Sequence, residues 1–267
     1  MANEQVVFKR SKVLTDAHLS YCPGCTHGVA HRLIADVIEE MNIQDKTIGV
    51  CPVGCSVLAY QFMHIDWHQA AHGRAPAVAT GVRRVLPQDK YVFTYQGDGD
   101  LASIGMAEIL HAANRGEKIT VIFINNAIYG MTGGQMAPTT LPGMKTTTSP
   151  YGRDTALCGH PIRMCEMINT LVEPKFIARG ALHAPKHINK AKKLIRQAFE
   201  LQHTGFTFVE LLSTCPTGWG LTPESSTHWL ERNMMPFFPL NTFRDPANLP
   251  EQAKPYKPDL KVSEDKK

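Results

Sequence analysis

The sequence contains no apolar stretch of the roughly 18 residues that a membrane-spanning helix needs. Charged residues or glycines interrupt every hydrophobic run. The opening segment, MANEQVVFKRSK, also lacks the apolar region of a secretion signal. We therefore expect a soluble, cytoplasmic protein with no membrane partner.

The sequence also lacks a strong excess of either positive or negative charge. The 28 lysines and arginines stand against 24 acidic residues, which gives a formal net charge of +4. Basic residues are dispersed except in KHINKAKKLIR at 186–196, where Ile188, Leu194 and Ile195 recur at helical spacing. This pattern is typical of the solvated face of a helix, and we expect no nucleic-acid partner.

The cysteines do not form an even set, as a disulfide framework would require. An odd number of thiols in a reducing cytosol makes metal or cluster ligation the leading explanation for them. Two cysteines stand three apart in SYCPGCTHG at 20–28. The seven cysteines are Cys22, Cys25, Cys51, Cys55, Cys158, Cys165 and Cys215.

Apolar strands alternate with amphipathic helices in the first half of the chain. Helices are expected at 29–41, 72–86 and 104–115, and strands at 46–56, 90–100 and 118–126. Ser103 is a candidate cap of the third helix, and Gly116 is a candidate for its end. The alternation predicts an α/β fold with a mostly parallel sheet flanked by helices.

The second half of the chain begins with a long segment that lacks apolar periodicity. Residues 127–153 are rich in Gly, Thr and Pro, and a loop of this length is usually functional. Helices at 161–171 and 186–203 follow, and then a strand at 206–214. We expect one main domain at 1–234 and, at 235–267, an extended Pro-rich C-terminal arm that lies on a partner and ends in a disordered tail.

Polar side chains follow two successive predicted strands. Asp98 stands between Gly97 and Gly99 in GDGD, and Asn126 ends the next strand two residues before the carbonyl of Ile128. Either piece alone is also compatible with an ordinary turn or strand end. Together, at the ends of neighbouring parallel strands, their oxygens are the ligands that Mg²⁺ prefers beside a diphosphate.

The order of these motifs resembles a known family. GDG, a helix and NN one βαβ unit later are similar to the diphosphate-binding signature of thiamine diphosphate enzymes. The set YCPGCTHG, PVGCS, AAHGRAPA, TYQGDGD, NNAIYGMTGGQMAPTT and STCPTGW resembles the β subunit of the 2-oxoacid:ferredoxin oxidoreductases over about residues 18–240. The resemblance implies a thiamine diphosphate-binding fold.

It also implies a [4Fe-4S] cluster. The positions that match the family's four ligands are Cys22, Cys25, Cys55 and Cys215. The Pro23-Gly24 turn is suited to aim two thiolates at one cluster. Cys51 ends the apolar TIGVC and is expected to pack as a small hydrophobe, while Cys158 and Cys165 match no motif.

The remaining site residues also follow from the resemblance. It implies Mg²⁺ ligation by Asp98, Asn126 and Ile128. His72 is the candidate acid or base. The expected contacts of thiamine diphosphate are Val53, Gly54, Cys55, Ser56, His72, Gly73, Gly97, Gly99, Asp100, Gly130, Met131 and Thr132.

The activity implied is oxidative decarboxylation of a 2-oxoacid to an acyl-CoA, with coenzyme A as cosubstrate and electrons passed through the cluster to ferredoxin. The sequence resembles most the members acting on 2-oxoglutarate or branched-chain 2-oxoacids such as 2-oxoisovalerate. It offers no domain for the aminopyrimidine-activating glutamate, so an α subunit is expected to complete the site. No C-x2-C-x2-C-x3-C run is present, so any ferredoxin-like clusters belong to another chain, such as a small γ or δ subunit.

Three alternatives remain open at this stage. The first is a zinc-stabilised nucleotide-binding module without redox activity, because four cysteines also suit zinc. The second is a non-redox thiamine enzyme, for which the four cysteines would have no purpose. The third is a pyruvate-specific member of the same family.

Overall fold

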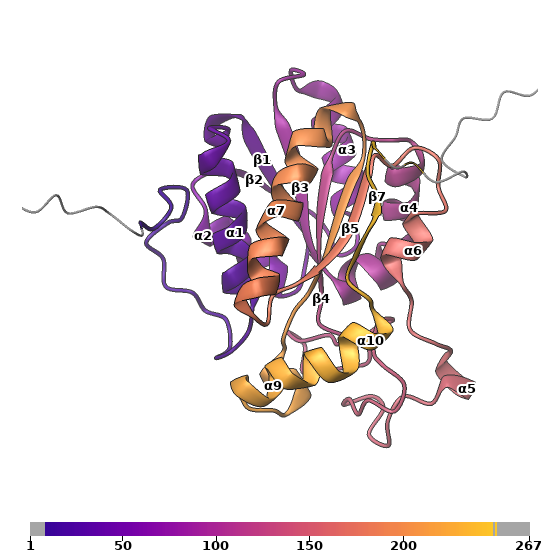
Figure 1. Ribbon diagram of the computed structural model, residues 1–267. Helices are drawn as coiled ribbons and strands as arrows, with labels where there is room; N and C mark the ends of the chain where they lie inside the picture. The colour runs from indigo at the N-terminus through magenta and orange to yellow at the C-terminus, as the bar shows by residue number, and fades with distance from the viewer. Residues whose placement is uncertain (1–8, 248, 250–267) are drawn as a thin grey trace, which may run out of the picture.

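The computed structural model describes residues 9–247 and 249, and its centre is a seven-stranded sheet (Figure 1). The strands lie in the order β2-β1-β3-β4-β6-β5-β7. The first six are parallel to one another, and only β7 is antiparallel to its neighbour β5. The strands are β1 Thr47–Cys51, β2 Asp66–Gln69, β3 Tyr91–Gly97, β4 Thr120–Asn125, β5 Phe176–Ala181, β6 Thr207–Leu212 and β7 Asn241–Arg244. The predicted α/β fold is confirmed.

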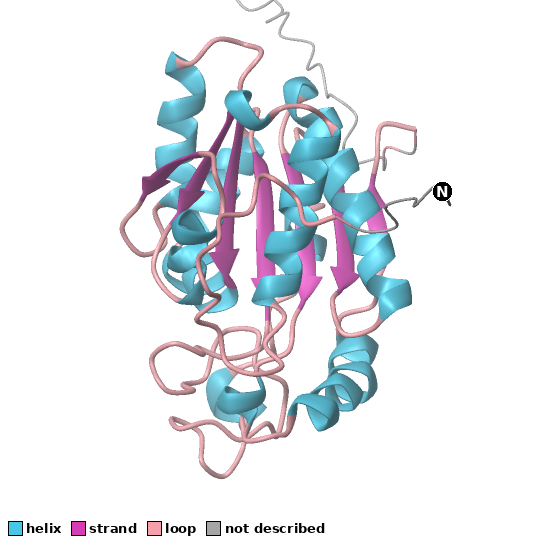
Figure 2. Cartoon of the chain, turned by 90° about the vertical axis from the view of Figure 1, so that its left-hand side faces the viewer, coloured by secondary structure: helices cyan, strands magenta, loops and turns pink. Residues whose placement is uncertain are grey.

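Helices cover both faces of the sheet. One face carries α1 His27–Glu40, α2 Ala59–Phe62 and α7 Pro185–Leu201, and the other carries α3 Ala75–Val85, α4 Met106–Asn114 and α6 Met164–Ile168. The remaining helices are α5 Thr155–Cys158, α8 Pro216–Trp219, α9 Pro223–Trp229 and α10 Met235–Phe237. Figure 2 shows the strands running toward one edge, where long loops gather. Among the described residues, no helix combines the length and apolarity needed to cross a membrane.

The central strands are apolar because both of their faces are covered. Every residue of β4, β5 and β6 is buried, as expected of a parallel sheet between two helical layers. Side chains alternate between the layers: Phe93 and Ile122 pack toward α1 and α7, whereas Val92 and Val121 pack toward α3 and α4. The sheet therefore separates two cores, and its carboxyl edge is free to carry a site.

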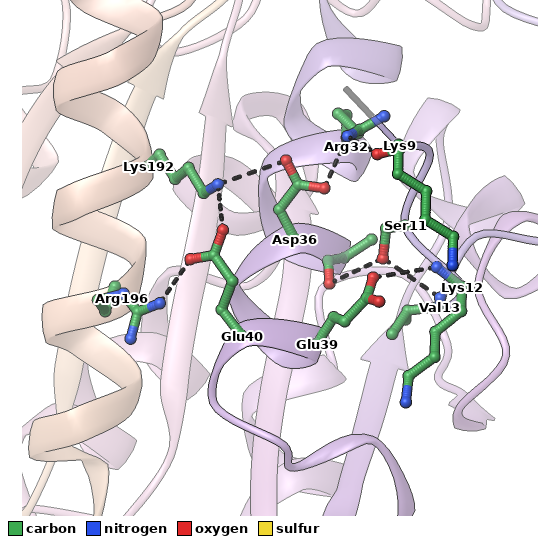
Figure 3. Close-up of polar contacts among 11 residues, drawn as sticks. Lys9, Ser11, Lys12, Val13, Arg32, Asp36, Glu39, Glu40, Lys192 and Arg196 are labelled. Atoms are coloured by element: carbon green, nitrogen blue, oxygen red, sulfur yellow. Dashed lines mark hydrogen bonds and ion pairs between the residues drawn. The ribbon is translucent and has the colours of Figure 1, made fainter. Parts of the chain in front are cut away.

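Ion pairs join the outer surfaces of α1 and α7 (Figure 3). Lys192 lies 2.6 Å from Glu40 and 3.5 Å from Asp36, and Arg196 lies 2.5 Å from Glu40. On α1 itself, Arg32 pairs with Asp36 at 2.6 Å. These pairs are partly exposed, so each contributes up to about 1 kcal/mol, and the apolar contacts beneath them carry most of the packing energy.

Two strands and one helix start differ from the sequence-based expectations. Strand β2 was not predicted because its residues, DWHQ, are mostly exposed at the sheet edge. Strand β5 was not predicted because Arg179 and Gly180 interrupt its apolar run. Ser103 does not cap a helix: residues Asp100–Ile104 form a π-helical turn, and α4 begins at Met106.

The segment after residue 234 also needs a correction. We expected an extended arm that lies on a partner, but β7 pairs with β5 of the same chain, and Phe238 is fully buried. Arg244 is 1% exposed and donates hydrogen bonds to backbone carbonyls of residues 169–174. Residues 235–244 therefore pack on the same sheet. The expected tail lies almost entirely outside the described residues.

Candidate functional site

A pocket opens at the carboxyl edge of the sheet, where the loops after β1, β3 and β4 meet. It is lined by His27, Val53, Gly54, Cys55, Ser56, His72, Gly97, Asp98, Gly99, Asp100, Asn126, Ile128, Tyr129, Gly130, Met131 and Thr132. Every residue predicted to contact thiamine diphosphate or Mg²⁺ is in this set except Gly73, which lies behind Asp100. The sequence reasoning missed His27 and Tyr129. The structure thus brings the predicted residues together, while their roles remain predictions.

Asp98 forms the buried acidic end of the pocket. Its Oδ2 accepts a hydrogen bond from Thr139 Oγ1 at 2.6 Å, and its Oδ1 accepts one from the Gly99 amide at 2.9 Å. Burial nevertheless raises the pKa of Asp98 to about 6. A carboxylate held in such a place is stabilised by a nearby cation, so this donor fits a hard divalent metal ion.

Asn126 lies beside it because β3 and β4 are adjacent, with Gly97 opposite Ile124 in the register. The side-chain oxygen of Asn126 accepts a hydrogen bond from the Ile128 amide at 3.2 Å. Its backbone carbonyl accepts another from Nε1 of Trp219 at 2.9 Å. The predicted Mg²⁺ ligands thus come from neighbouring strand ends, as the sequence indicated.

A steric constraint, which the sequence did not reveal, explains why residue 99 is a glycine. A Cβ at this position would lie 2.2 Å from the ring of Tyr129. Tyr129 in turn donates a hydrogen bond to the carbonyl of Gly99 at 2.8 Å. The glycine therefore lets the loop after β3 lie flat against the loop after β4, which closes the floor of the pocket.

His72 is oriented by a buried carboxylate. Its Nδ1 donates to Oδ1 of Asp100 at 2.5 Å, and the Gly73 amide donates to the same oxygen at 2.6 Å. Oδ2 of Asp100 accepts from Gln96 at 2.6 Å. Burial raises the pKa of Asp100, and the hydrogen bonds from Gln96, Gly73 and His72 act in the opposite direction. Nε2 of His72 is consequently the nitrogen left for a ligand, and the side chain of Asp100 has a function that we had not predicted.

The four cysteines predicted as cluster ligands also lie together. A Cβ added to Gly130 would be 3.2 Å from Sγ of Cys215 and 3.9 Å from Sγ of Cys55. Burial raises the pKa of Cys25 to about 11 and that of Cys215 to about 12. Smaller contributions come from the neighbouring thiols: Cys55 and Cys22 act on Cys25, and Cys25 and Cys55 act on Cys215. Cys215 and Cys55 therefore lie on either side of the side-chain-free Gly130, and Cys25 is close enough to influence both thiols.

Hydrogen bonds fasten the loop that carries Cys22 and Cys25 to the end of β6. The amide of Cys25 donates to the carbonyl of Cys22 at 3.0 Å, which closes the turn. Thr214, next to Cys215, donates from its hydroxyl to the carbonyl of Gly24 at 2.7 Å, and its amide donates to the hydroxyl of Thr26 at 3.1 Å. The cysteine-bearing segments are thus fixed relative to each other by the protein chain.

The other three cysteines lie elsewhere. Cys51 is fully buried, and its thiol donates to the carbonyl of Val57 at 3.6 Å. Cys165 is fully buried and donates to the carbonyl of Ala178 at 3.6 Å, whereas Cys158 is exposed. Among the described residues, no group of three or more His, Cys, Asp and Glu side chains is arranged around a single metal ion. Ligation at the four cysteines is therefore a proposal.

Comparison with known proteins adds independent findings. The family model described as thiamine pyrophosphate enzyme, C-terminal TPP binding domain, matches residues 52–211. Ketoisovalerate oxidoreductase subunit VorA of Methanothermobacter thermautotrophicus is 48% identical over 241 residues, which cover 90% of this chain and 50% of the relative. The chain therefore spans about half the length of that relative.

Two further similarities cover more of the matched protein. The 2-oxoglutarate synthase subunit KorB of Methanocaldococcus jannaschii is 38% identical over 205 residues, which are 75% of this chain and 70% of the relative. A solved structure of 2-oxoglutarate:ferredoxin oxidoreductase from Magnetococcus marinus, with 2-oxoglutarate, coenzyme A and succinyl-CoA bound, superposes with a TM-score of 0.70 at 30% identity. That match covers 80% of this chain and 70% of that one.

Proposed function

The chain belongs to the thiamine pyrophosphate-binding subunits of the 2-oxoacid:ferredoxin oxidoreductases, and from this premise we propose that it is the β subunit of a coenzyme A-acylating enzyme of that family. One observation carries the proposal. Asp98 and Asn126, which suit a metal ion, and Cys55, which belongs to the four-thiol group, line the same pocket. A diphosphate site beside a thiolate site is what this redox chemistry requires.

The polar residues of the pocket have separate tasks in the proposal. Asp98, Asn126 and the carbonyl of Ile128 would hold Mg²⁺, and the backbone around Gly99 and Gly130 would bind the diphosphate. Thiamine diphosphate would supply the carbanion chemistry for decarboxylation of a 2-oxoacid, and a [4Fe-4S] cluster at the four cysteines would supply one-electron acceptance. His72 presents Nε2 to the pocket, where it holds or moves a proton.

Four thiols support an iron-sulfur cluster more than a structural zinc. Cys22 is exposed and the other three are partly buried, and Cys55 and Cys215 flank Gly130, which has no side chain to fill the space beside them. A structural zinc explains neither the pocket that Cys55 shares with Asp98 nor the similarity to enzymes named for ferredoxin. Iron and acid-labile sulfide in the anaerobically purified protein are expected, whereas zinc alone would contradict the proposal.

A partner subunit is part of the proposal because this chain supplies half of an active site. Val53 and Met131 line the pocket although they are 43% and 47% exposed, so apolar surface stands at its mouth. A larger α subunit that brings the aminopyrimidine-activating glutamate would cover these side chains. Small γ and δ subunits and ferredoxin complete the proposed assembly.

The names of the relatives support an order of preference among the candidate substrates. A subunit named for ketoisovalerate is 48% identical, and one named for 2-oxoglutarate is 38% identical. We therefore favour 2-oxoisovalerate over 2-oxoglutarate, and pyruvate is the third candidate. Coenzyme A is the proposed acyl acceptor, in line with its presence in the Magnetococcus structure.

The test is coenzyme A-dependent viologen reduction by the chain coexpressed with its α-type partner. Pyruvate, 2-oxoglutarate and 2-oxoisovalerate are compared in parallel, with ferredoxin reduction as a second readout. We expect turnover by the complex, fastest with 2-oxoisovalerate, and none by the isolated chain. Full turnover by the isolated chain with thiamine diphosphate, Mg²⁺, coenzyme A and a 2-oxoacid would refute the proposal that this chain supplies only half of the active site.

A further inference from the structure

A group of aromatic rings lies directly behind the pocket and has no task in the proposed function. Tyr21 stacks on His27 at 4.9 Å and on His31 at 5.5 Å between ring centroids. Tyr95 lies 4.8 Å from the ring of His31, and Phe62 lies 5.6 Å from that of Tyr21. His27 reaches the pocket itself, so this ring group connects the pocket wall to α1 and α2.

The hydroxyl of Tyr21 has two polar neighbours. It lies 2.7 Å from Nε2 of His31 and 3.2 Å from the backbone carbonyl oxygen of Cys55. The carbonyl only accepts hydrogen bonds, so the single hydroxyl proton of Tyr21 points to Cys55. Nε2 of His31 must then donate to the oxygen of Tyr21.

The state of His31 agrees with this direction. His31 is fully buried, and burial lowers its pKa well below the usual value, so the ring is neutral and carries one proton. With that proton on Nε2, Nδ1 is a bare lone pair, and Nδ1 has no hydrogen-bond partner within the described part of the chain. The result is a directed chain from His31 through Tyr21 to the carbonyl of Cys55.

This series of hydrogen bonds ends on the backbone of one predicted cluster ligand, Cys55, and its middle member, Tyr21, is next to another, Cys22. Tyr21 adjoins Cys22 in the sequence and binds the backbone of Cys55, which comes from the loop after β1. The link from Thr214 to Gly24 already fixes the Cys215 segment to the same loop. Tyr21 therefore supplies the missing tie between the loop of Cys22 and Cys25 and the loop of Cys55.

We propose that Tyr21 is a positioning residue that holds Cys55 against the Cys22–Cys25 turn and raises the reduction potential of the cluster bound there. The inference rests on the [4Fe-4S] cluster of the proposed function. Reduction adds negative charge, and the positive end of the Tyr21 hydroxyl dipole points toward the backbone of a ligand. Hydrogen bonds to the sulfurs and outer-shell contacts that orient the ligands both contribute to such potentials, and the Tyr21 bond to the Cys55 backbone is a contact of the second kind.

The experiment compares Tyr21→Phe with Tyr151→Phe in the purified complex. Phenylalanine keeps the ring stack and removes only the hydroxyl, and Tyr151 is 98% exposed, so it is a matched control. Iron and acid-labile sulfide are measured first. The midpoint potential is then titrated by following the electron paramagnetic resonance signal of the reduced cluster.

We expect Tyr21→Phe to retain iron and sulfide, to shift the midpoint potential to a more negative value and to alter the signal, while Tyr151→Phe matches the wild type. Unchanged potential and signal in Tyr21→Phe, or an equal shift in Tyr151→Phe, overturns the inference. If Tyr21→Phe loads poorly, His31→Phe decides, because it keeps an aromatic ring against Tyr21 and removes the hydrogen-bond donor: a smaller shift in the same direction supports the inference, and no shift overturns it. A wild-type complex without iron and sulfide instead overturns the proposed function.

Discussion

Nδ1 of His72 donates a 2.5 Å hydrogen bond to Oδ1 of Asp100, which is 3% exposed. The two residues come from different loops, one before α3 and the other after β3. The Gly73 amide and Gln96 hold the carboxylate in place. Asp100 thus orients the ring of His72 and occupies its Nδ1, which leaves Nε2 for a ligand.

Asp100→Asn is expected to lower the kcat of the complex by about 10²-fold, the lower end of the usual contribution of a positioned acid or base. An amide cannot accept hydrogen bonds on both sides, so it opposes either the His72 or the Gln96 donor. Thiamine diphosphate content should stay close to that of the wild type. The measurement is steady-state kinetics with bound cofactor assayed in parallel.

A double-mutant cycle separates positioning from an independent effect. If Asp100 acts through His72, the variant that combines Asp100→Asn with His72→Ala should be no slower than His72→Ala alone. Additive losses would show that Asp100 acts by another route.

Asp98→Asn should weaken Mg²⁺-dependent retention of thiamine diphosphate by at least about 10- to 100-fold, since even groups that only support a metal ligand have effects of that size. The substitution keeps the shape of the side chain and removes its charge, so the fold should persist by circular dichroism. Asp66→Asn, on the exposed face of β2, is the control. Normal cofactor content in Asp98→Asn would contradict the assignment of Asp98 as a Mg²⁺ ligand.

Single changes to serine test the cluster ligands. We expect Cys22→Ser, Cys25→Ser, Cys55→Ser and Cys215→Ser each to lower the iron content and bleach the brown colour. The matched controls Cys51→Ser, Cys158→Ser and Cys165→Ser should keep both, because the thiols of Cys51 and Cys165 are occupied by backbone carbonyls and Cys158 is exposed at the end of α5. Loss of iron in Cys51→Ser together with normal iron in Cys55→Ser would exchange the roles of these two residues.

A buried ion pair supports the C-terminal side of the sheet. Nε of Arg179 lies 2.8 Å from Oε2 of Glu210, and both side chains are fully buried. The guanidinium also stacks on Phe238 and Phe243 and donates to the carbonyl of Pro239. Arg179 therefore links the centre of the sheet to the segment that leads into β7.

Arg179→Leu should lower the free energy of unfolding by about 3–5 kcal/mol, because it leaves Glu210 buried without its partner. Arg196→Leu breaks a partly exposed pair with Glu40 and should cost about 1 kcal/mol or less. Denaturant unfolding of the two variants, with the wild type alongside, measures the difference. Equal losses of unfolding free energy in the two variants would mean that the buried pair stabilises the fold no more than the exposed pair does.

The sequence by itself determined the parallel sheet and the pocket. Alternating apolar strands and amphipathic helices leave few topologies, and the carboxyl ends of adjacent parallel strands must meet at one edge. For this reason the motifs GDGD and NN predict neighbouring strand ends, and β3 and β4 are indeed adjacent. The CPGC motif likewise indicated a turn that carries two thiols, because a short spacing fixes local geometry.

Only the tertiary structure decided the contacts between distant segments. Strand β5 lacks a continuous apolar pattern because the buried Arg179 is paired with Glu210. Strand β2 lacks one because it lies at the sheet edge and is mostly exposed. Asp100 meets His72, and Tyr21 meets Cys55, across 28 and 34 residues of chain. Such hydrogen bonds leave no periodic signal, since they depend on how whole layers pack. The sequence therefore predicted which residues line the pocket, and packing decided which side chains support them.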